Sequence, residues 1–203
     1  MVSKLALDFL AYETVKSQLL NGAFRPGEHV TPRDIAKKLA ISSTPVVIAL
    51  HRLAAERMLE RSEGEGFSVP RLSGSELREL YHTLEVLLVD GLEFAQPSPP
   101  AVSVNHDAFG ASDAMARSTW HFFRNLLGAT GRPVYLIYGG NINDRLQPYR
   151  IHKDSLLNGR DRELQNLSSL WAAADFGGLT KALREYYQRR QAVAERIAQN
   201  TYK

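Results

Sequence analysis

The sequence of 203 residues contains no cysteine. This absence excludes disulfides, thiolate catalysis and zinc sites built from cysteine, and it is compatible with a reducing cytosol. The chain also lacks any apolar run near the roughly 20 residues that a membrane-spanning helix requires. No basic and apolar leader segment opens the sequence. We therefore expect a cytoplasmic protein that does not enter a membrane.

Catalytic motifs are also missing. The histidines show no H-E-x-x-H spacing, and neither a G-x-S-x-G elbow nor a Walker loop is present. The glycine-containing segments GEGFSV and IYGGNIN lack the strand–loop–helix setting of a phosphate-binding loop. The sequence thus predicts neither an enzyme nor a cofactor.

A strong excess of charge is absent too, since the formal net charge is only +3. Residues 1–72 carry 10 Lys and Arg against 8 Asp and Glu. DNA-binding proteins commonly have a clearer basic surface, so the total neither requires nor excludes DNA. The positions are more informative, because basic residues gather in one short region: Arg33, Lys37, Lys38, Arg52, Arg57 and Arg61.

That region belongs to a segment from Thr31 to Val69, TPRDIAKKLAISSTPVVIALHRLAAERMLERSEGEGFSV. It predicts a helix at 32–39, a tight turn at 41–42, a second helix from 43, a strand at 58–61, a turn at 63–66 and a returning strand at 67–69. Thr31 is a good N-cap for the first helix, and Ser43 or Thr44 for the second. This succession is a winged helix-turn-helix, whose second helix presents its N-terminal residues to DNA bases.

Helical periodicity accounts for most of the remaining chain. One helix is expected before this segment, at 8–20, and others follow it at 74–95, 112–130, 133–157, 161–174 and 179–199. The proline-rich stretch QPSPPAVSVNHD reads as an internal link between helices. We predict a mainly α protein, with a winged helix-turn-helix domain of α+β type at residues 1–72 and an antiparallel α-helical bundle at 73–203.

From Gly22 to Val69 the sequence resembles the GntR family of bacterial transcription regulators. The resemblance lies in the segments GAFRPGEHV, DIAKKLAISSTPV and IALHRLAAERMLERSEGEGFSV. The helical half resembles, more weakly, the effector-binding domain of the FadR-type branch, through ELRELYHTLE, WHFFRNLLGATGRP and RELQNLSSLWAAADFGGLTKALREYY. Between Ala95 and His121 the chain is shorter than that domain, so one of its helices is expected to be reduced or missing.

The resemblance implies DNA contacts, although two of the expected side chains differ. Where the family has arginines that read base edges, this sequence has Ser43 and Val47, and Ile48 replaces the acidic residue that follows. Arg33 matches a contacting position that is retained. The candidate DNA-binding residues are Arg33, Lys37, Ser42, Ser43, Thr44, Val47, His51, Arg52 and Gly64. Three interpretations stay open: an altered sequence preference, weak DNA binding, or loss of the operator.

The resembled effector domain often holds a divalent ion through one Asp and three His, which correspond here to Arg117, His121, Leu164 and Tyr186. Only one ligand is left and an arginine repels a cation, so we predict no metal site. Arg117 and His121 instead share one helix face, where forked donors suit a carboxylate or phosphate. The candidate effector-binding residues are Arg117, His121, Tyr135, Tyr138, Asn141, Arg145 and Tyr186, with Tyr149 and Arg150 beside them.

Together these features predict a ligand-responsive transcriptional regulator that binds a palindromic double-stranded DNA operator as a homodimer. A repressor is the family expectation, and the expected effector is a small anionic metabolite such as an organic acid. The alternative is a small-molecule-binding or protein-interaction module whose winged domain has lost specific DNA readout. Ser43, Val47 and the acidic wing residues Glu63 and Glu65 motivate that alternative.

Overall fold

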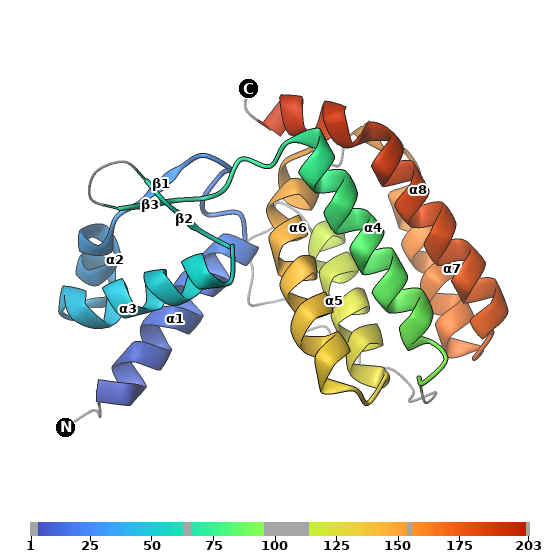
Figure 1. Cartoon of the computed structure of the whole chain (residues 1–203), viewed down its shortest axis with the longest axis horizontal. Helices are drawn as coiled ribbons and strands as arrows, with labels where there is room; N and C mark the ends of the chain where they lie inside the picture. The colour runs from blue at the N-terminus through green and yellow to red at the C-terminus, as the bar shows by residue number, and fades with distance from the viewer. Residues whose placement is uncertain (1–3, 63–65, 96–113, 154–155, 202–203) are drawn as a thin grey trace. The chain divides into compact units, whose positions relative to one another are not determined.

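The computed structural model describes residues 4–62, 66–95, 114–153 and 156–201. The chain divides into two compact units, Met1–Arg71 and Leu72–Thr201, with Tyr202 and Lys203 at the end of the chain. Helices make up most of the described residues, and the strands form one small antiparallel sheet (Figure 1). The predicted fold class, a winged helix-turn-helix followed by a helical region, is confirmed.

The first unit combines three helices with the sheet. Its elements are α1 (Lys4–Leu20), β1 (His29–Val30), α2 (Pro32–Leu39), α3 (Ser43–Ala55), β2 (Glu60–Arg61) and β3 (Phe67–Ser68). The strands lie in the order β1-β3-β2, so β3 pairs with both neighbours. Apolar side chains of all three helices, including Val15, Ile35 and Leu50, form one buried cluster with the sheet. This shared core fixes α2 and α3 relative to each other.

The strands of this unit differ from the prediction. β2 is shorter than the strand predicted at 58–61. No strand was predicted before α2, but His29 and Val30 pair with Ser68 and Phe67. A two-residue strand is too short to show a periodic pattern, and partners distant in the sequence create it. The first helix begins at Lys4, ahead of the predicted start at Asp8, because helix-favouring residues continue beyond the stretch that the core requires.

The caps of the helix pair show why α3 begins where it does. Thr31 caps α2 as predicted and accepts a hydrogen bond from the Asp34 amide at 3.3 Å. The expected cap of α3 was wrong, because Ser42 is its N-cap and Ser43 is already helical. Ser42 makes no side-chain capping bond, and Pro45 at the third helical position removes one of the two amides that could donate such a bond.

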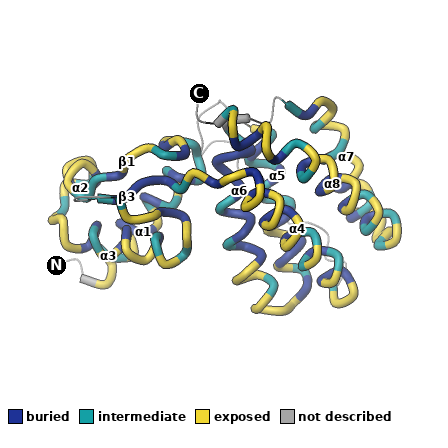
Figure 2. The backbone as a smooth tube through the Cα atoms, turned by 45° about the horizontal axis from the view of Figure 1, so that its top comes forward, coloured by how far each residue is buried: buried dark blue, intermediate teal, exposed yellow. Residues whose placement is uncertain are grey.

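The described residues of the second unit form helices joined by turns and loops. Its elements are α4 (Gly74–Gly91), α5 (Ala114–Ala129), η2 (Tyr135–Gly139), α6 (Gly140–Lys153), α7 (Arg160–Ala172) and α8 (Phe176–Thr201). Buried and exposed residues alternate along α4, as the colours show in Figure 2, and its buried stripe includes Leu77, Leu84 and Leu88. These leucines pack in a cluster with residues of the other helices.

The helix predicted at 133–157 is a composite. A π-helical turn, η2, ends at Gly139, and α6 continues from Gly140 with Pro148 inside it. The glycine pair thus marks a change of helix type instead of a break. The proline-rich link after α4 lies outside the described residues, as does most of the region where a helix was expected to be reduced.

The start of α4 allows one stability prediction. The Ser73 hydroxyl accepts from the Glu76 amide at 3.2 Å, and the Glu76 carboxylate accepts from the Ser73 amide at 2.8 Å. We expect Ser73→Ala to lower the free energy of unfolding by about 0.5–2 kcal/mol. Both tryptophans belong to this unit, so urea unfolding followed by tryptophan fluorescence reports on it. Ser75→Ala, which leaves the cap intact, is the control, and an equal loss there would contradict the prediction.

The same cap gives the loss a pH dependence. Hydrogen bonds from Ser73 lower the pKa of the Glu76 carboxyl below its ordinary value. A lowered pKa means that the contribution is present above the unfolded pKa and is lost as pH falls through the folded pKa. The difference between wild type and Ser73→Ala should therefore shrink in acid.

Candidate nucleic-acid interface and buried polar cluster

The second helix of the pair, α3, has one buried face and one exposed face. Pro45, Val46, Ala49, Leu50 and Leu53 are buried against the rest of the first unit. The predicted contact residues on the other face are therefore accessible. Exposed are Ser42, Ser43, Thr44 and His51, together with Arg33 and Lys37 of α2.

Val47 and Gly64 differ from these exposed candidates. Val47 is half-buried at the edge of the exposed face, so it contributes only part of its surface to a partner. Gly64 and the acidic wing residues Glu63 and Glu65 lie outside the described residues. The structure therefore describes the helix pair and the base of the wing.

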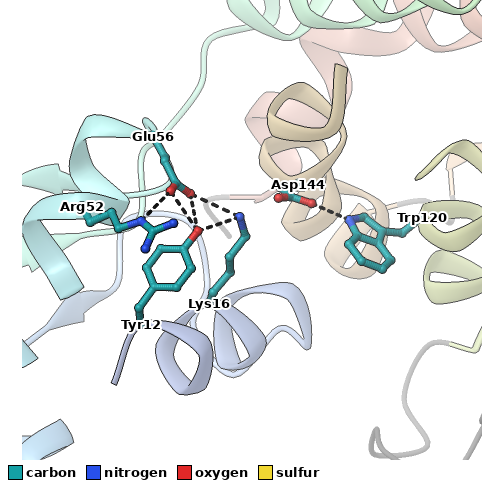
Figure 3. A network of polar contacts seen from close by, with 6 residues as sticks. All are labelled: Tyr12, Lys16, Arg52, Glu56, Trp120 and Asp144. Atoms are coloured by element: carbon teal, nitrogen blue, oxygen red, sulfur yellow. Dashed lines mark hydrogen bonds and ion pairs between the residues drawn. The ribbon is translucent and has the colours of Figure 1, made fainter. Parts of the chain in front are cut away.

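Arg52 has contacts within the unit. Its guanidinium lies 3.8 Å from the centroid of the Tyr12 ring, and its Nε is 3.4 Å from a Glu56 carboxylate oxygen (Figure 3). The Tyr12 hydroxyl donates to the same carboxylate at 2.8 Å, and Lys16 lies 3.2 Å from it. Burial, first among several causes, raises the pKa of Tyr12. This network joins α1 to α3. It engages the Arg52 guanidinium, which is therefore not available to contact DNA bases in this arrangement.

A second pair of basic residues lies at the base of the wing. A guanidinium nitrogen of Arg61, on β2, is 3.3 Å from Nδ1 of His51, on α3. The His51 ring meets the Phe67 ring edge to face, with centroids 5.1 Å apart. Both Arg61 and His51 are exposed, so strand and helix present hydrogen-bonding groups together.

In the second unit, the polar feature that stands out is a buried arginine on α6. Arg150 is only 1% exposed. Its Nη1 donates to the Asn143 carbonyl at 3.1 Å and lies 3.4 Å from the Gln147 side-chain oxygen. Its Nε and Nη2 are buried without a hydrogen-bond partner in the part of the chain that the structure describes. A buried cation whose partners are all neutral is costly, because it has lost water and gained no counter-charge.

Aromatic side chains surround this guanidinium. It lies 5.7 Å from the centroid of Phe123, whose ring is 5.5 Å from that of Tyr187. The Tyr187 hydroxyl is buried, has no hydrogen-bond partner among the described residues and interacts electrostatically with Arg150. Burial raises the pKa of Tyr187 well above its ordinary value, so this hydroxyl is a neutral donor at pH 7. The cluster thus combines one cation and one hydroxyl with donor capacity.

A neighbouring buried arginine shows the contrast. The Arg190 guanidinium lies 3.3 Å from the centroid of Tyr186 and 3.0 Å from a Glu163 carboxylate oxygen. That carboxylate supplies a counter-charge of the kind that Arg150 lacks among the described residues. Tyr186, a predicted effector-binding residue, is therefore buried beneath Arg190.

The other predicted effector-binding residues are dispersed. Burial lowers the pKa of His121 on α5, and the nearby charges of Arg117 and Arg124 lower it further. Arg117 and His121 are therefore close together. Tyr135 donates a hydrogen bond to the Asp90 carboxylate. The Tyr138 side chain is 64% exposed and therefore does not line the interior of the unit.

Asn141 and Arg145 are half-buried on α6. The structure thus brings Arg117 and His121 together but does not gather the full predicted set. Sequence reasoning named Arg150 as a neighbouring candidate but missed the hydroxyl of Tyr187 and the two polar residues, Asn143 and Gln147, that form a row with Arg150 on α6. Their spacing of four and three residues on one helix face, beside the buried Leu146, was the available signal.

The described residues contain no group of three or more His, Cys, Asp or Glu arranged to hold a metal ion. None of the helices within the described ranges is both long and apolar enough to cross a bilayer.

Residues 10–69 match the family of bacterial regulatory proteins described as the gntR family. This match lies within the first unit and covers less than half of the chain. The chain is 30% identical over 70 residues to the uncharacterized HTH-type transcriptional regulator YdhC of Bacillus subtilis, covering 34% of this chain and 31% of that protein. It is 35% identical over 66 residues to the HTH-type transcriptional regulator McbR of Escherichia coli, covering 32% and 30%. Both relatives are transcriptional regulators by name, and the aligned part spans about a third of each.

Solved structures extend the similarity in fold to nearly the whole chain. E. coli McbR/YncC superposes with a TM-score of 0.68 at 20% identity, covering 97% of this chain and 99% of that one. A putative GntR transcriptional regulator from Rhodococcus sp. RHA1 gives a TM-score of 0.72 at 17% identity, covering 92% and 96%. At these identities the likeness shows the fold alone and does not transfer residue roles.

Proposed function

We propose that the protein is a DNA-binding transcriptional regulator whose DNA affinity responds to a small anionic ligand. The exposed N-terminal face of α3 carries this proposal, because the buried residues of α3 fix its orientation on the scaffold. Exposed cations on α2 and β2, among them Arg33, Lys37 and Arg61, flank that face. A helix held in this way enters a major groove while the flanking cations contact phosphates.

A homodimer is part of the proposal. Two copies of one recognition helix read two half-sites about one helical turn apart, which matches a palindromic operator. A repressor follows if the operator overlaps a promoter, and a cytoplasmic location follows from the need to reach DNA. The GntR-type match supports this assembly but covers only the first unit of the chain.

The ligand response rests on the buried cluster of the second unit. An organic acid offers the acceptors that the Nε and Nη2 groups of Arg150 and the Tyr187 hydroxyl lack among the described residues. A carboxylate accepts two parallel hydrogen bonds from one guanidinium, with the charge complementarity that Arg150 needs. Binding of an acid there would favour one conformation of the unit and so change operator affinity.

Fluorescence anisotropy with duplexes enriched from a random library tests the DNA-binding function. We expect the logarithm of the affinity to fall linearly with the logarithm of the salt concentration, because phosphate contacts release counterions. Arg33→Ala should weaken binding and make that slope shallower by about one unit if Arg33 contacts phosphate. Arg162→Ala, at an exposed position on α7, serves as the charge-matched control.

The outcome separates the two functions under consideration. Enriched sequences bound more tightly than random DNA support the regulator. No sequence preference at any salt concentration contradicts it and favours the alternative, a binding module that has lost specific DNA readout. The structural observation in favour of this alternative is that Arg52 makes contacts within the first unit.

A further inference from the structure

The exposed face of α3 is unusually poor in charge for a helix proposed to read DNA. Ile48 is 42% exposed and lies four residues after Thr44 and three before His51, so the three share one row. Half-buried Val47 extends the aliphatic surface next to Ile48. An accessible aliphatic patch therefore occupies the middle of the face that would meet the bases.

Charged base readers are scarce on the same helix. Arg52 is the single arginine or lysine in the sequence of α3. Its guanidinium lies over the Tyr12 ring and beside the Glu56 carboxylate, in contacts that join α3 to α1. The bidentate recognition of guanine, which needs a forked cation aimed at the groove, is therefore not provided by α3 in this arrangement.

The major groove offers one apolar group to such a helix. That group is the C5-methyl of thymine, because the remaining base edges present hydrogen-bond donors and acceptors. We propose that Ile48, with Val47 beside it, reads thymine methyl groups, so that each operator half-site carries T·A pairs where α3 enters the groove. This inference rests on the proposed DNA-binding function and adds the class of sequence that the helix selects.

Neighbouring groups suit this arrangement. The hydroxyls of Ser43 and Thr44 are exposed at the helix start and adapt to donors or acceptors on either base pair. Arg61 and His51, joined at 3.3 Å, lie at the wing end of the same face. Phosphate contacts by cations set the register, while the aliphatic row supplies the discrimination between thymine and cytosine.

Replacing thymine with deoxyuridine removes only the methyl group and tests the idea directly. Duplexes enriched by the wild-type protein are resynthesised with deoxyuridine at one thymine at a time. We expect deoxyuridine at one or two positions in each half-site to lower the affinity about threefold to tenfold, because the burial of one methyl group is lost. Deoxyuridine at other thymines should leave the affinity unchanged.

Two variants assign the effect to Ile48. Ile48→Ala should bind thymine and deoxyuridine duplexes equally, while circular dichroism confirms that the exposed substitution leaves the fold intact. Val86→Ala removes a comparably exposed aliphatic side chain from α4 and should keep the full deoxyuridine penalty. Placing 5-methylcytosine, which carries the same methyl group, at a sensitive position should restore part of the affinity lost on changing thymine to cytosine.

Failure of the inference can be told apart from failure of the proposed function. If no sequence is enriched from the library, the DNA-binding function itself is wrong. If a sequence is enriched but tolerates deoxyuridine at every thymine, only the methyl readout is overturned. An undiminished deoxyuridine penalty in Ile48→Ala overturns the assignment to Ile48.

Discussion

Replacing Arg150 with methionine should stabilise the ligand-free protein and abolish its stabilisation by organic acids. We expect the free energy of unfolding of the second unit to rise, by analogy with the gain of about 1–4 kcal/mol seen when apolar residues replace buried ion pairs. The reason is that Nε and Nη2 of Arg150 are buried without partners among the described residues. Methionine is unbranched and adaptable, so it fills the space beside Phe123 without a desolvated charge.

The ligand response should disappear in the same variant. In the wild type, an acid at one hundred times its dissociation constant adds about 2.7 kcal/mol to the free energy of unfolding. Acetate, succinate, citrate and inorganic phosphate are suitable probes, and the tryptophan fluorescence of Trp120 and Trp171 reports on the second unit. Arg150→Met should show no such gain with any of them.

Two further variants make the result interpretable. Arg184→Met removes an exposed arginine from α8 and should change neither stability nor the response by more than a few tenths of a kcal/mol. Tyr187→Phe removes only the buried hydroxyl, which should be neutral or stabilising without ligand because both shapes pack alike. A loss of several kcal/mol in Arg150→Met would instead mean that Arg150 is satisfied within the protein and that the ligand proposal is wrong.

The buried polar cluster was predicted only in part from the sequence, since Arg150 was a candidate but its neighbours Gln147 and Tyr187 were not. The helix-turn-helix followed from short-range rules: Thr31 as a cap, Pro32 at the first helical position and the apolar repeat on α3. Such rules act within a few residues, so the sequence contains them directly. The strand at His29 and Val30 was missed because its partners, in β3, lie far along the chain.

Sites assembled from several helices are harder to predict than the helices. Polar residues such as Tyr138 and Tyr187 look alike in the sequence, yet one is 64% exposed and the other is fully buried. The rotation of each helix about its axis decides between these outcomes, and distant packing partners set that rotation. The contact of Arg52 with Tyr12 could not be predicted for the same reason, because it depends on how α1 packs against α3.

Packing between α4 and α8 supports a second prediction of large effect. An added Cβ at Gly74 would lie 2.7 Å from the Cα of Glu195 and 2.0 Å from one of its carboxylate oxygens. The carboxylate can rotate away, but the backbone atom belongs to α8 and moves only with that helix. Gly74→Ala should therefore lower the free energy of unfolding by about 1–3 kcal/mol, as overpacked cores do.

Gly128→Ala provides the opposite case on α5. Apart from its chain neighbours and the backbone of its own helix, no described atom lies within 4 Å of an added Cβ at Gly128, so the substitution meets open space. Alanine there should raise the free energy of unfolding by about 0.5–1 kcal/mol, because glycine loses more backbone entropy in a helix. Urea unfolding followed by tryptophan fluorescence should give opposite signs for the two variants. A stabilising Gly74→Ala would contradict the prediction. It would mean that α8 can move away near Glu195 at little cost in free energy.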